Sequence, residues 1–330
     1  MIIGIRNQTL RVCITYRCNA SCKVCYSRGL NQEFPYDMSL EDFNYMVNWA
    51  KKLSWTKFMF LGGEPTIHPH FKDFLEICYN KEIGITLSTN GLFTDNILKA
   101  IRPSYVTICL DYLEGQIQNP NYKKIFFRNL EYLKKRKVFI VLSGLIDGVS
   151  ERWKETIEIA KNFNLHIKWS LRLPGYGNNH LHTEEFFKPE AFGRQLLQIL
   201  ELSKEKQVFS FVYRPVLLCM FTPEQLKELT KLNKYLFFTR CVLGFRGDYT
   251  LALTVNPDLS IYPCNNFYLK GPSIRNFKDR ASINRYLKEV VDPVLMSPSS
   301  EKCKDCAFFL RFKATLKERK LLLKENLFSE

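Results

Sequence analysis

Three cysteines lie within eight residues near the start of the chain, in the segment CNASCKVC. Cys18, Cys22 and Cys25 are spaced too tightly for the ligand pairs that zinc usually takes, and the loop itself contains no fourth Cys or His. Iron–sulfur clusters prefer thiolate ligands, and a cubane cluster needs one ligand for each of its four irons. Three protein thiolates would therefore hold such a cluster and leave one iron open to a ligand from outside the chain.

The segments around this loop predict the elements that must position it. Apolar and β-branched runs that indicate strands lie at residues 9–15, 57–61, 84–88, 105–110, 138–143 and 166–171. Helical patterns separate them, at residues 39–53, 70–79, 95–101, 122–136 and 151–163. This alternation is typical of an α/β fold with a parallel sheet, in which functional loops follow the carboxyl ends of the strands.

The pattern changes after about residue 180. We expect a short strand at 208–213 and helices at 189–204, 223–236 and 311–325, the last of them basic. Asn256, Pro257 and Asp258 predict a hairpin turn between strands at 249–255 and 260–262. The chain is therefore expected to hold two domains, residues 1–215 and residues 216–330.

The cysteine loop, placed directly after the first predicted strand, resembles the signature of the radical SAM superfamily. Three further segments resemble motifs of that family, each at the end of a predicted strand: Gly62-Gly63-Glu64-Pro65, Ser88-Thr89-Asn90-Gly91 and Cys109-Leu110-Asp111. In the last of these, Cys109 stands where the family usually has serine. The resemblance covers about residues 9–175 and implies a partial (β/α)6 barrel followed by a smaller α+β domain.

The resemblance also implies cofactors and their chemistry. Cys18, Cys22 and Cys25 would hold a [4Fe–4S] cluster whose open iron is chelated by S-adenosylmethionine (SAM) through its amino and carboxylate groups. Reduction of the cluster would cleave the sulfonium and release a 5′-deoxyadenosyl radical, which abstracts a hydrogen atom from the substrate.

Residues at the strand ends are the candidates for SAM contacts. The GGEP segment, Gly62 to Pro65, would seat the methionine amino group, because glycines allow close backbone approach and a carboxylate suits an ammonium. Further candidates are Thr89, Asn90 and Asp111 on the ribose side, and Ser143 and Arg172 elsewhere. Arg172 would alternatively meet an acidic group of the substrate or lie on the surface.

A second set of four cysteines lies in the last third of the chain: Cys241, Cys264, Cys303 and Cys306. Its surroundings resemble the auxiliary-cluster domains called SPASM and twitch, with Leu259 where the family often has glycine. The full SPASM pattern needs more cysteines than these four, so the shorter twitch form, with one auxiliary [4Fe–4S] cluster, fits better. A zinc site is the alternative, since C-x2-C pairs are common there.

Other reactive side chains have simpler interpretations. Cys219 belongs to neither set and is a candidate hydrogen-atom donor to a substrate radical, with burial as a small apolar side chain as the alternative. We expect Cys13 and Cys78 in the core. His68 and His70, after the GGEP segment, are interpreted as part of a turn, with a role as metal ligands as the alternative.

Composition and charge limit the class of protein. No apolar run is long enough to span a membrane, and the first residues lack the order of a signal peptide, so we expect a cytoplasmic protein. Eleven cysteines then favour metal or catalytic use over disulfides. The net charge of +15 favours an acidic partner, although a solvated basic surface explains it equally well.

Three hypotheses about the substrate follow. The first is a ribosomally made peptide, oxidised, crosslinked or epimerised, with the precursor held by the barrel, the second domain or a separate peptide-binding protein. The second is a small molecule such as a sugar or aminocyclitol, dehydrogenated with the auxiliary cluster as electron acceptor. The third, nucleic-acid or nucleotide modification, depends mainly on charge, because no RNA-binding module is recognisable. Each would need a reducing partner such as flavodoxin or ferredoxin.

Overall fold

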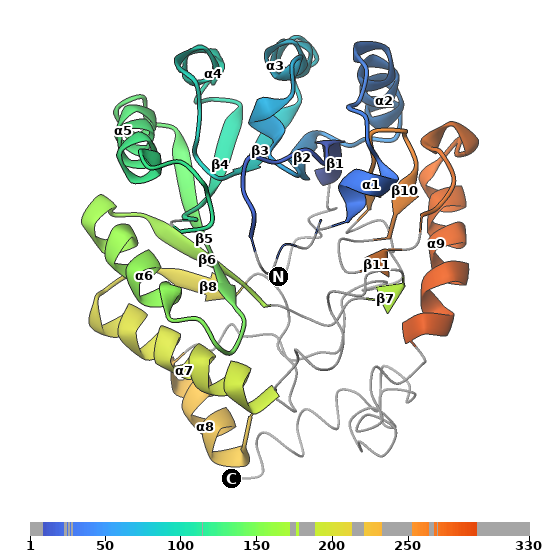
Figure 1. The fold of residues 1–330 in the computed structure, drawn as a ribbon. Helices are drawn as coiled ribbons and strands as arrows, with labels where there is room; N and C mark the ends of the chain where they lie inside the picture. The colour runs from blue at the N-terminus through green and yellow to red at the C-terminus, as the bar shows by residue number, and fades with distance from the viewer. Residues whose placement is uncertain are drawn as a thin grey trace. The chain divides into compact units, whose positions relative to one another are not determined.

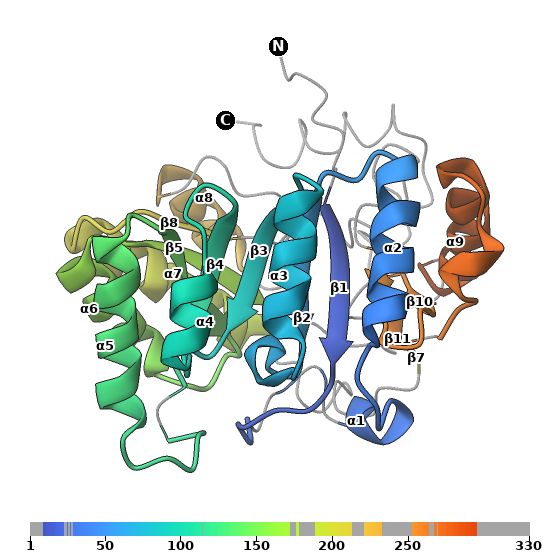
Figure 2. The ribbon, with the colours of Figure 1, turned by 90° about the horizontal axis from the view of Figure 1, so that it is seen from above.

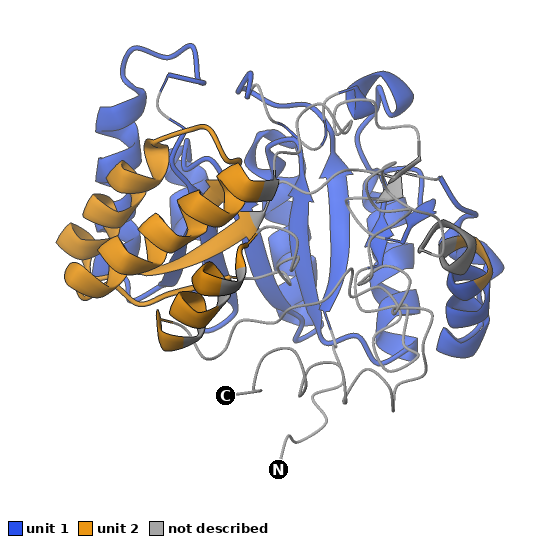
Figure 3. Cartoon of the chain, turned by 90° about the horizontal axis from the view of Figure 1, so that it is seen from below, with its two compact units in different colours: residues 1–143, 177–181, 243–288 blue, residues 144–176, 182–242, 289–330 orange. Residues whose placement is uncertain are grey.

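A computed structural model describes residues 9–22, 25, 27, 29–113, 115–171, 176–177, 189–212, 221–232, 253–263, 267–268 and 270–295. The chain divides into two compact units (Figure 3). Unit 1 holds Met1–Ser143, Gly177–Leu181 and Leu243–Lys288, and unit 2 holds Gly144–Tyr176, His182–Val242 and Glu289–Glu330. Unit 1 thus groups residues 243–288 with the N-terminal part of the chain. The expected division into domains at residue 215 would separate these two parts, and it stays a prediction.

Parallel strands form the centre of unit 1. Their bounds are β1 (Thr9–Thr15), β2 (Lys57–Gly62), β3 (Gly84–Thr89), β4 (Val106–Asp111) and β5 (Phe139–Ile146). Each pairs in parallel with the next, and β9 (Thr254–Val255) pairs in parallel with the other side of β1. The strand β10 (Ile261–Tyr262) returns antiparallel to β9. Among the described strands of this unit the two ends of the order do not pair, so the sheet is open.

Helices cover one face of these strands (Figures 1 and 2). They are α2 (Leu40–Lys52), α3 (Phe71–Asn80), α4 (Asp95–Ala100) and α5 (Tyr122–Lys135). The helix α2 begins at Ser39, whose side chain accepts a hydrogen bond from the backbone N–H of Asp42 at 3.0 Å, as the predicted cap requires. Unit 1 also contains the shorter elements α1 (Leu30–Glu33), η1 (Pro65–Ile67), β11 (Phe267–Tyr268) and η7 (Ile274–Asn276).

Aromatic side chains fill the space between helices and strands. Phe43 of α2 stacks on Phe74 of α3 with ring centroids 4.1 Å apart, and it also contacts Phe58 and Phe60 of β2. All four side chains are fully buried. Burial of this much apolar surface is the main stabilising term of the unit and holds the strand ends in place.

Unit 2 continues the alternation. Its described elements are α6 (Arg152–Phe163), β6 (His166–Leu171), α7 (Pro189–Glu205), β8 (Ser210–Val212) and α8 (Pro223–Leu232). The strands β6 and β8 pair in parallel. Gly144 lies against the ring of Trp169, where an added Cβ would come within 2.0 Å of the ring. The strands β5 and β7 (Tyr176–Gly177) and the helix α9 (Arg280–Leu295) each contain a unit boundary, which in β5 lies between Ser143 and Gly144.

The predicted α/β fold with a parallel sheet is confirmed. The expected strands and helices between residues 9 and 171 are present, with ends that differ by at most three residues, and the hairpin turn at 256–258 is present too. Cys13 and Cys78 are buried, as expected. The predicted basic helix at 311–325 lies outside the described residues, and α9 was not predicted. None of the described helices is both long and apolar enough to cross a lipid bilayer.

Candidate functional site

The cysteine loop begins three residues after β1 ends. Cys18 is exposed, and Cys22 and Cys25 are partly exposed. The backbone N–H of Ala20 donates to the sulfur of Cys18 at 3.4 Å, and the sulfur of Cys25 lies 3.1 Å from the hydroxyl of Ser27. The thiols therefore sit on one short loop that remains accessible to a ligand.

The protein around Cys18 favours its neutral thiol in the absence of a metal. Although Cys18 is exposed, the protein packed around its sulfur removes part of the water that would stabilise a thiolate, and together with the negative charge of Glu64 this raises the pKa of Cys18 to about 11. A bound metal ion would reverse this preference, because a cation stabilises the thiolate. As placed, no three Cys, His, Asp or Glu side chains of the described residues converge on one ion position, so the ligand role of the three cysteines stays a prediction.

The GGEP segment is bonded to the backbone that leads into the cysteine loop. The N–H of Gly63 donates to the carbonyl of Thr15 at 3.0 Å, and the N–H of Glu64 donates to the carbonyl of Arg17 at 2.9 Å. An added Cβ on Gly62 would lie 2.2 Å from the Thr15 oxygen, and one on Gly63 would lie 2.0 Å from the Arg17 oxygen. The sequence predicts that these glycines let a ligand approach, and in the structure they let two stretches of this chain meet.

The carboxylate of Glu64 is buried at the centre of the site, with 2% of the residue exposed. One oxygen accepts hydrogen bonds from the N–H of Thr66 at 3.2 Å, its hydroxyl at 2.7 Å and the hydroxyl of Thr89 at 2.8 Å. The other accepts from the N–H of Asn90 at 2.8 Å. Burial raises the pKa of Glu64, and these hydrogen bonds oppose the rise. All four donors are neutral, so a cation placed nearby would stabilise this carboxylate.

Asn90 joins the Glu64 network to the cysteine loop. Its side-chain amide donates to Oδ1 of Asn19, the residue after Cys18, at 2.6 Å. Asn90 and Thr89 are each 3% exposed, so most of their surface contacts the protein. The predicted site residues Glu64, Thr89 and Asn90 therefore form one bonded group.

A residue that the sequence did not single out completes this edge of the sheet. The hydroxyl of Tyr122, the first residue of α5, lies 3.2 Å from the carbonyl oxygen of Asn90 and 3.4 Å from that of Asp111. It accepts a hydrogen bond from the N–H of Leu113 at 2.8 Å. Burial raises the pKa of Tyr122, so its hydroxyl stays protonated and can donate. A lone tyrosine at a helix start carries no sequence signal for this role.

The predicted residues of β4 and β5 also lie together. Asp111 and Ser143 are direct partners in the register of the two strands. The hydroxyl of Ser143 is buried and forms no hydrogen bond with a described residue. A buried hydroxyl without a partner is costly, so this atom is suited to a polar group of a bound molecule.

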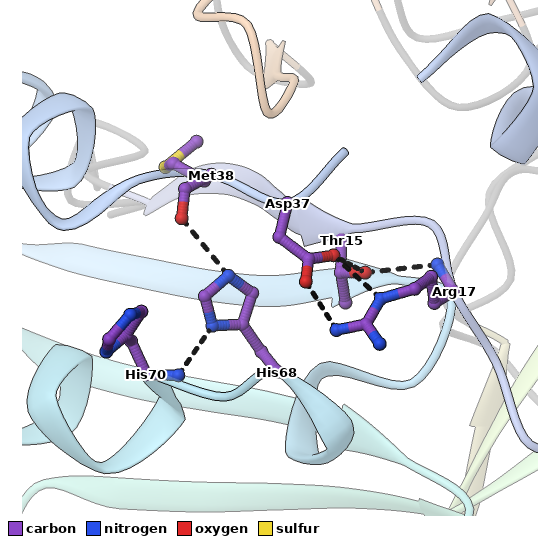
Figure 4. A network of polar contacts seen from close by, with 6 residues as sticks. All are labelled: Thr15, Arg17, Asp37, Met38, His68 and His70. Carbon is purple, nitrogen blue, oxygen red and sulfur yellow. Dashed lines mark hydrogen bonds and ion pairs between the residues drawn. The ribbon is translucent and has the colours of Figure 1, made fainter. Parts of the chain in front are cut away.

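A second polar network holds the residue before Cys18 (Figure 4). The carboxylate of Asp37 accepts from the hydroxyl of Thr15 at 2.6 Å and from Nε of Arg17 at 3.0 Å, and it forms an ion pair with that guanidinium. Burial alone would raise the pKa of Asp37, but the bonds from Arg17 and Thr15 outweigh burial and lower it.

His68 belongs to the same network and is not placed as a metal ligand. The N–H of His70 donates to its Nδ1 at 3.0 Å, which leaves the ring proton on Nε2 to bond the carbonyl of Met38 at 3.1 Å (Figure 4). Burial lowers the pKa of His68 to about 4, so the ring is neutral near pH 7. The interpretation of this segment as a turn is confirmed.

Several predicted site residues lie outside the described part of the chain: Arg172, Cys219, Cys241, Cys264, Cys303 and Cys306. Their roles stay predictions.

Comparisons with known proteins agree with the geometry of the site. The family model described as the radical SAM superfamily matches residues 12–189, more than half of the chain. The matched segment contains the cysteine loop, the GGEP segment and the ends of β3, β4 and β5.

Curated proteins with similar sequences include two that differ in function. A tungsten-containing aldehyde ferredoxin oxidoreductase cofactor-modifying protein of Pyrococcus furiosus is 35% identical over 192 residues, 56% of this chain and 47% of that protein. A probable GTP 3′,8-cyclase of Methanococcus maripaludis is 29% identical over 137 residues, 40% of this chain and 45% of that protein. The chain therefore spans about half the length of the curated relatives it matches.

A solved structure is similar in fold. Streptococcus suis SuiB bound to the precursor peptide SuiA superposes with a TM-score of 0.64 at 14% identity, over 92% of this chain and 70% of that chain. At this level of identity the likeness shows the fold alone.

Proposed function

The chain belongs to the radical SAM superfamily, and from this membership we propose that it cleaves SAM reductively and uses the resulting 5′-deoxyadenosyl radical to take a hydrogen atom from a ribosomally made peptide. The observation that carries the proposal is the bonded edge of unit 1. There the cysteine loop, the GGEP segment and the end of β3 are joined by the bonds from Gly63 to Thr15, from Glu64 to Arg17 and from Asn90 to Asn19.

The residues present fit the cofactors that the family uses. Cys18, Cys22 and Cys25 would hold a [4Fe–4S] cluster, which is the donor set such clusters prefer. Glu64 offers a buried carboxylate with only neutral donors, which suits the ammonium of SAM, and Ser143 offers a buried hydroxyl without a described partner. When bound, the reduced cluster and SAM supply one electron and a sulfonium whose cleavage gives methionine and a carbon radical.

The other residues of this edge hold the groups that would contact the cofactors in place. Thr89 fixes the Glu64 carboxylate, Asn90 fixes the loop that carries Cys18, and Asp111 lies beside Ser143 on the ribose side of the proposed SAM position. A radical must be kept from water, which the second domain would accomplish by covering the site. Arg172 would contact the SAM carboxylate or an acidic group of the substrate.

The second cysteine set would hold one auxiliary [4Fe–4S] cluster, on Cys241, Cys264, Cys303 and Cys306. Four protein thiolates would close that cluster and suit it to electron transfer. Cys219 is the candidate hydrogen-atom donor for a reaction that ends without net oxidation. A flavodoxin or ferredoxin would supply the electrons.

A peptide substrate is supported by fold and by charge. The similar SuiB structure contains a bound precursor peptide, and the net charge of +15 suits a peptide with acidic residues. A separate peptide-binding protein would present the precursor if the two units do not hold it themselves.

A small-molecule substrate is the second candidate. It is supported by the sequence relatives, one named for GTP cyclisation and one for cofactor modification. Dehydrogenation of a sugar or an aminocyclitol would be a small-molecule reaction of this kind. Both candidates share the radical step and differ only in the molecule that loses the hydrogen atom.

The test is reconstitution under anaerobic conditions with iron and sulfide, followed by assay for 5′-deoxyadenosine after reduction in the presence of SAM. About eight irons per chain would support two clusters, and about four irons with zinc would support the first cluster only. Cys18→Ala should abolish 5′-deoxyadenosine formation, whereas Cys78→Ala, in the core, should not. A chain that binds no iron would contradict the proposal. Mass spectrometry with candidate peptides and with nucleotides would separate the two substrates.

A further inference from the structure

The β9–β10 hairpin of unit 1 lies against the start of the cysteine loop. Its first strand pairs with β1, which leads into that loop. The hydroxyl of Tyr16, two residues before Cys18, donates to Oδ1 of Asn256 in the hairpin turn at 2.7 Å. Tyr16 is 4% exposed and Asn256 is fully buried. Because water does not compete for it, this hydrogen bond holds the two segments together more strongly than an exposed bond would.

The segment that follows the cysteine loop is anchored at the same place. Leu30 and Phe34, which come after Cys25, pack in one buried cluster with Tyr16 and Tyr262. The ring of Tyr16 stacks on Phe34 at 5.2 Å, and Phe34 meets the ring of Tyr262 edge-on at 6.3 Å. Both ends of the cysteine loop therefore enter a cluster to which the hairpin contributes Tyr262.

The hairpin is itself well bonded, so it can serve as a fixed support. The side-chain amide of Asn256 donates to the hydroxyl of Ser260 at 3.0 Å, and its backbone N–H donates to the Ser260 carbonyl at 2.9 Å. Asp258 accepts from the N–H of Ser260 at 2.9 Å and pairs with Lys270 at 2.6 Å. These bonds leave Oδ1 of Asn256 oriented toward Tyr16.

We propose that the β9–β10 hairpin is a support for the first cysteine loop, with Tyr16 and Asn256 as positioning residues. The hairpin is more than 200 residues away in sequence, and it ends two residues before Cys264 of the second cysteine set. The inference rests on the proposed function for what the loop holds, but the support itself is present in the chain without cofactor.

Amide hydrogen exchange on the cofactor-free full chain tests the support directly. Tyr16→Phe keeps the ring on Phe34 and removes only the hydroxyl, and we expect amides of residues 17–25 to exchange about tenfold faster. Tyr79→Phe is the matched control, because Tyr79 is 3% exposed and its hydroxyl, away from the loop, donates to the carbonyl of Ala100 at 3.0 Å and accepts from the N–H of Arg102 at 3.1 Å. Equal acceleration in both variants, or none in Tyr16→Phe, would overturn the proposal.

A double-mutant cycle measures the coupling between Tyr16 and Asn256 separately from any general loss of stability in one variant. Asn256→Ala alone should accelerate exchange of the same amides. Combined with Tyr16→Phe it should add less than its separate effect, since both changes remove one shared bond. Fully multiplicative effects would mean that the two residues act independently.

Iron retention connects the support to function. In the reconstituted chain, the first cluster is identified by the paramagnetic signal that changes when SAM is added. After addition of a chelator, we expect this signal to disappear about fivefold to tenfold faster in Tyr16→Phe than in wild type. If the exchange result holds but wild type binds no iron, the proposed function fails and the support stands. If wild type cleaves SAM but both readouts of Tyr16→Phe match wild type, the support fails and the proposed function stands.

Discussion

The side-chain amide of Asn90 lies 2.6 Å from Oδ1 of Asn19 and thereby ties the end of β3 to the residue after the first cysteine of the loop. The backbone of Asn90 is occupied as well, with its N–H on Glu64 and its carbonyl beside the Tyr122 hydroxyl. One residue thus connects the cysteine loop, the GGEP segment and the start of α5. Such a network responds to a single substitution as a unit.

Asn90→Ala should therefore weaken SAM binding. The change removes the bond to Asn19, leaves that side chain free to move and lowers the order of the loop, and we expect the Kd for SAM to rise about tenfold. Equilibrium binding to the reconstituted chain measures it. Asn44→Ala is the control, because that side chain of α2 is exposed and donates to the Leu40 carbonyl at 2.9 Å, away from the loop. Unchanged SAM affinity in Asn90→Ala would contradict the role of the bond.

Glu64→Gln tests the charge at the centre of the site. The amide keeps the shape of the side chain but removes the negative charge that would meet the ammonium of SAM, so SAM affinity should fall by at least about tenfold. The amide nitrogen would also face donors that now point at an oxygen, which weakens the network.

The matched control for Glu64 is Glu76→Gln. Glu76 pairs with Arg102 at 2.8 Å, with both side chains 49% exposed, and should contribute little. Isothermal titration with SAM compares the two variants. A Glu64→Gln chain that folds and binds SAM as tightly as wild type would show that the carboxylate does not bind the ammonium.

Gly63→Ala should disrupt the join between the GGEP segment and the cysteine loop. Its new methyl group would lie 2.0 Å from the Arg17 carbonyl oxygen, and backbone on both sides must shift, at a cost of about 3 kcal/mol or more in the free energy of unfolding. Gly84→Ala is the control, because its methyl group would meet only the flexible side chain of Lys57 at 3.1 Å. Denaturant unfolding compares them, and similar losses in both would contradict the steric argument.

Lowering the pH should destabilise the cofactor-free chain, and His68 is the expected cause. Its pKa is about 4 in the folded chain against an ordinary 6.5, so between these values the unfolded chain binds more protons. The stabilisation is complete above about pH 6.5 and is lost as pH falls toward 4, by about 2 to 3 kcal/mol. Denaturant unfolding at several pH values measures the slope.

The His68 slope has a matched control. His68→Gln should flatten the fall between pH 6.5 and 4, whereas His70→Gln, an exposed side chain of the same network, should leave it in place. An unchanged slope in His68→Gln would assign the fall to other groups.

Local signals in the sequence predicted the order of the elements well. Ser39 and Asp42 predicted the start of α2, and β-branched runs predicted strands such as β4, because caps and periodicity depend on neighbours a few residues apart. Leu259 is instructive too. Its φ is 64°, a left-handed conformation that glycine adopts without strain. This conformation explains why the family that the segment resembles often has glycine at this position.

Contacts between distant segments could not be predicted in this way. The pairing of β9 with β1, the bond from Asn90 to Asn19 and the place of Tyr122 each join residues that no periodic pattern relates. The glycines of the GGEP segment show the limit clearly. Their need for close approach was predictable, but the neighbour that approaches, the backbone of Thr15 and Arg17, was not.

The bond from Tyr16 to Asn256 spans 240 residues of sequence, and this separation has a consequence for synthesis of the protein. At 5 to 20 residues per second, a ribosome takes roughly 10 to 50 seconds to make the residues between them. The three thiols of the loop thus emerge long before β9, the strand of the hairpin that pairs with β1. Until the hairpin arrives, the nascent chain carries reactive cysteines without their final neighbours, so correct metal loading is expected to follow completion of the chain.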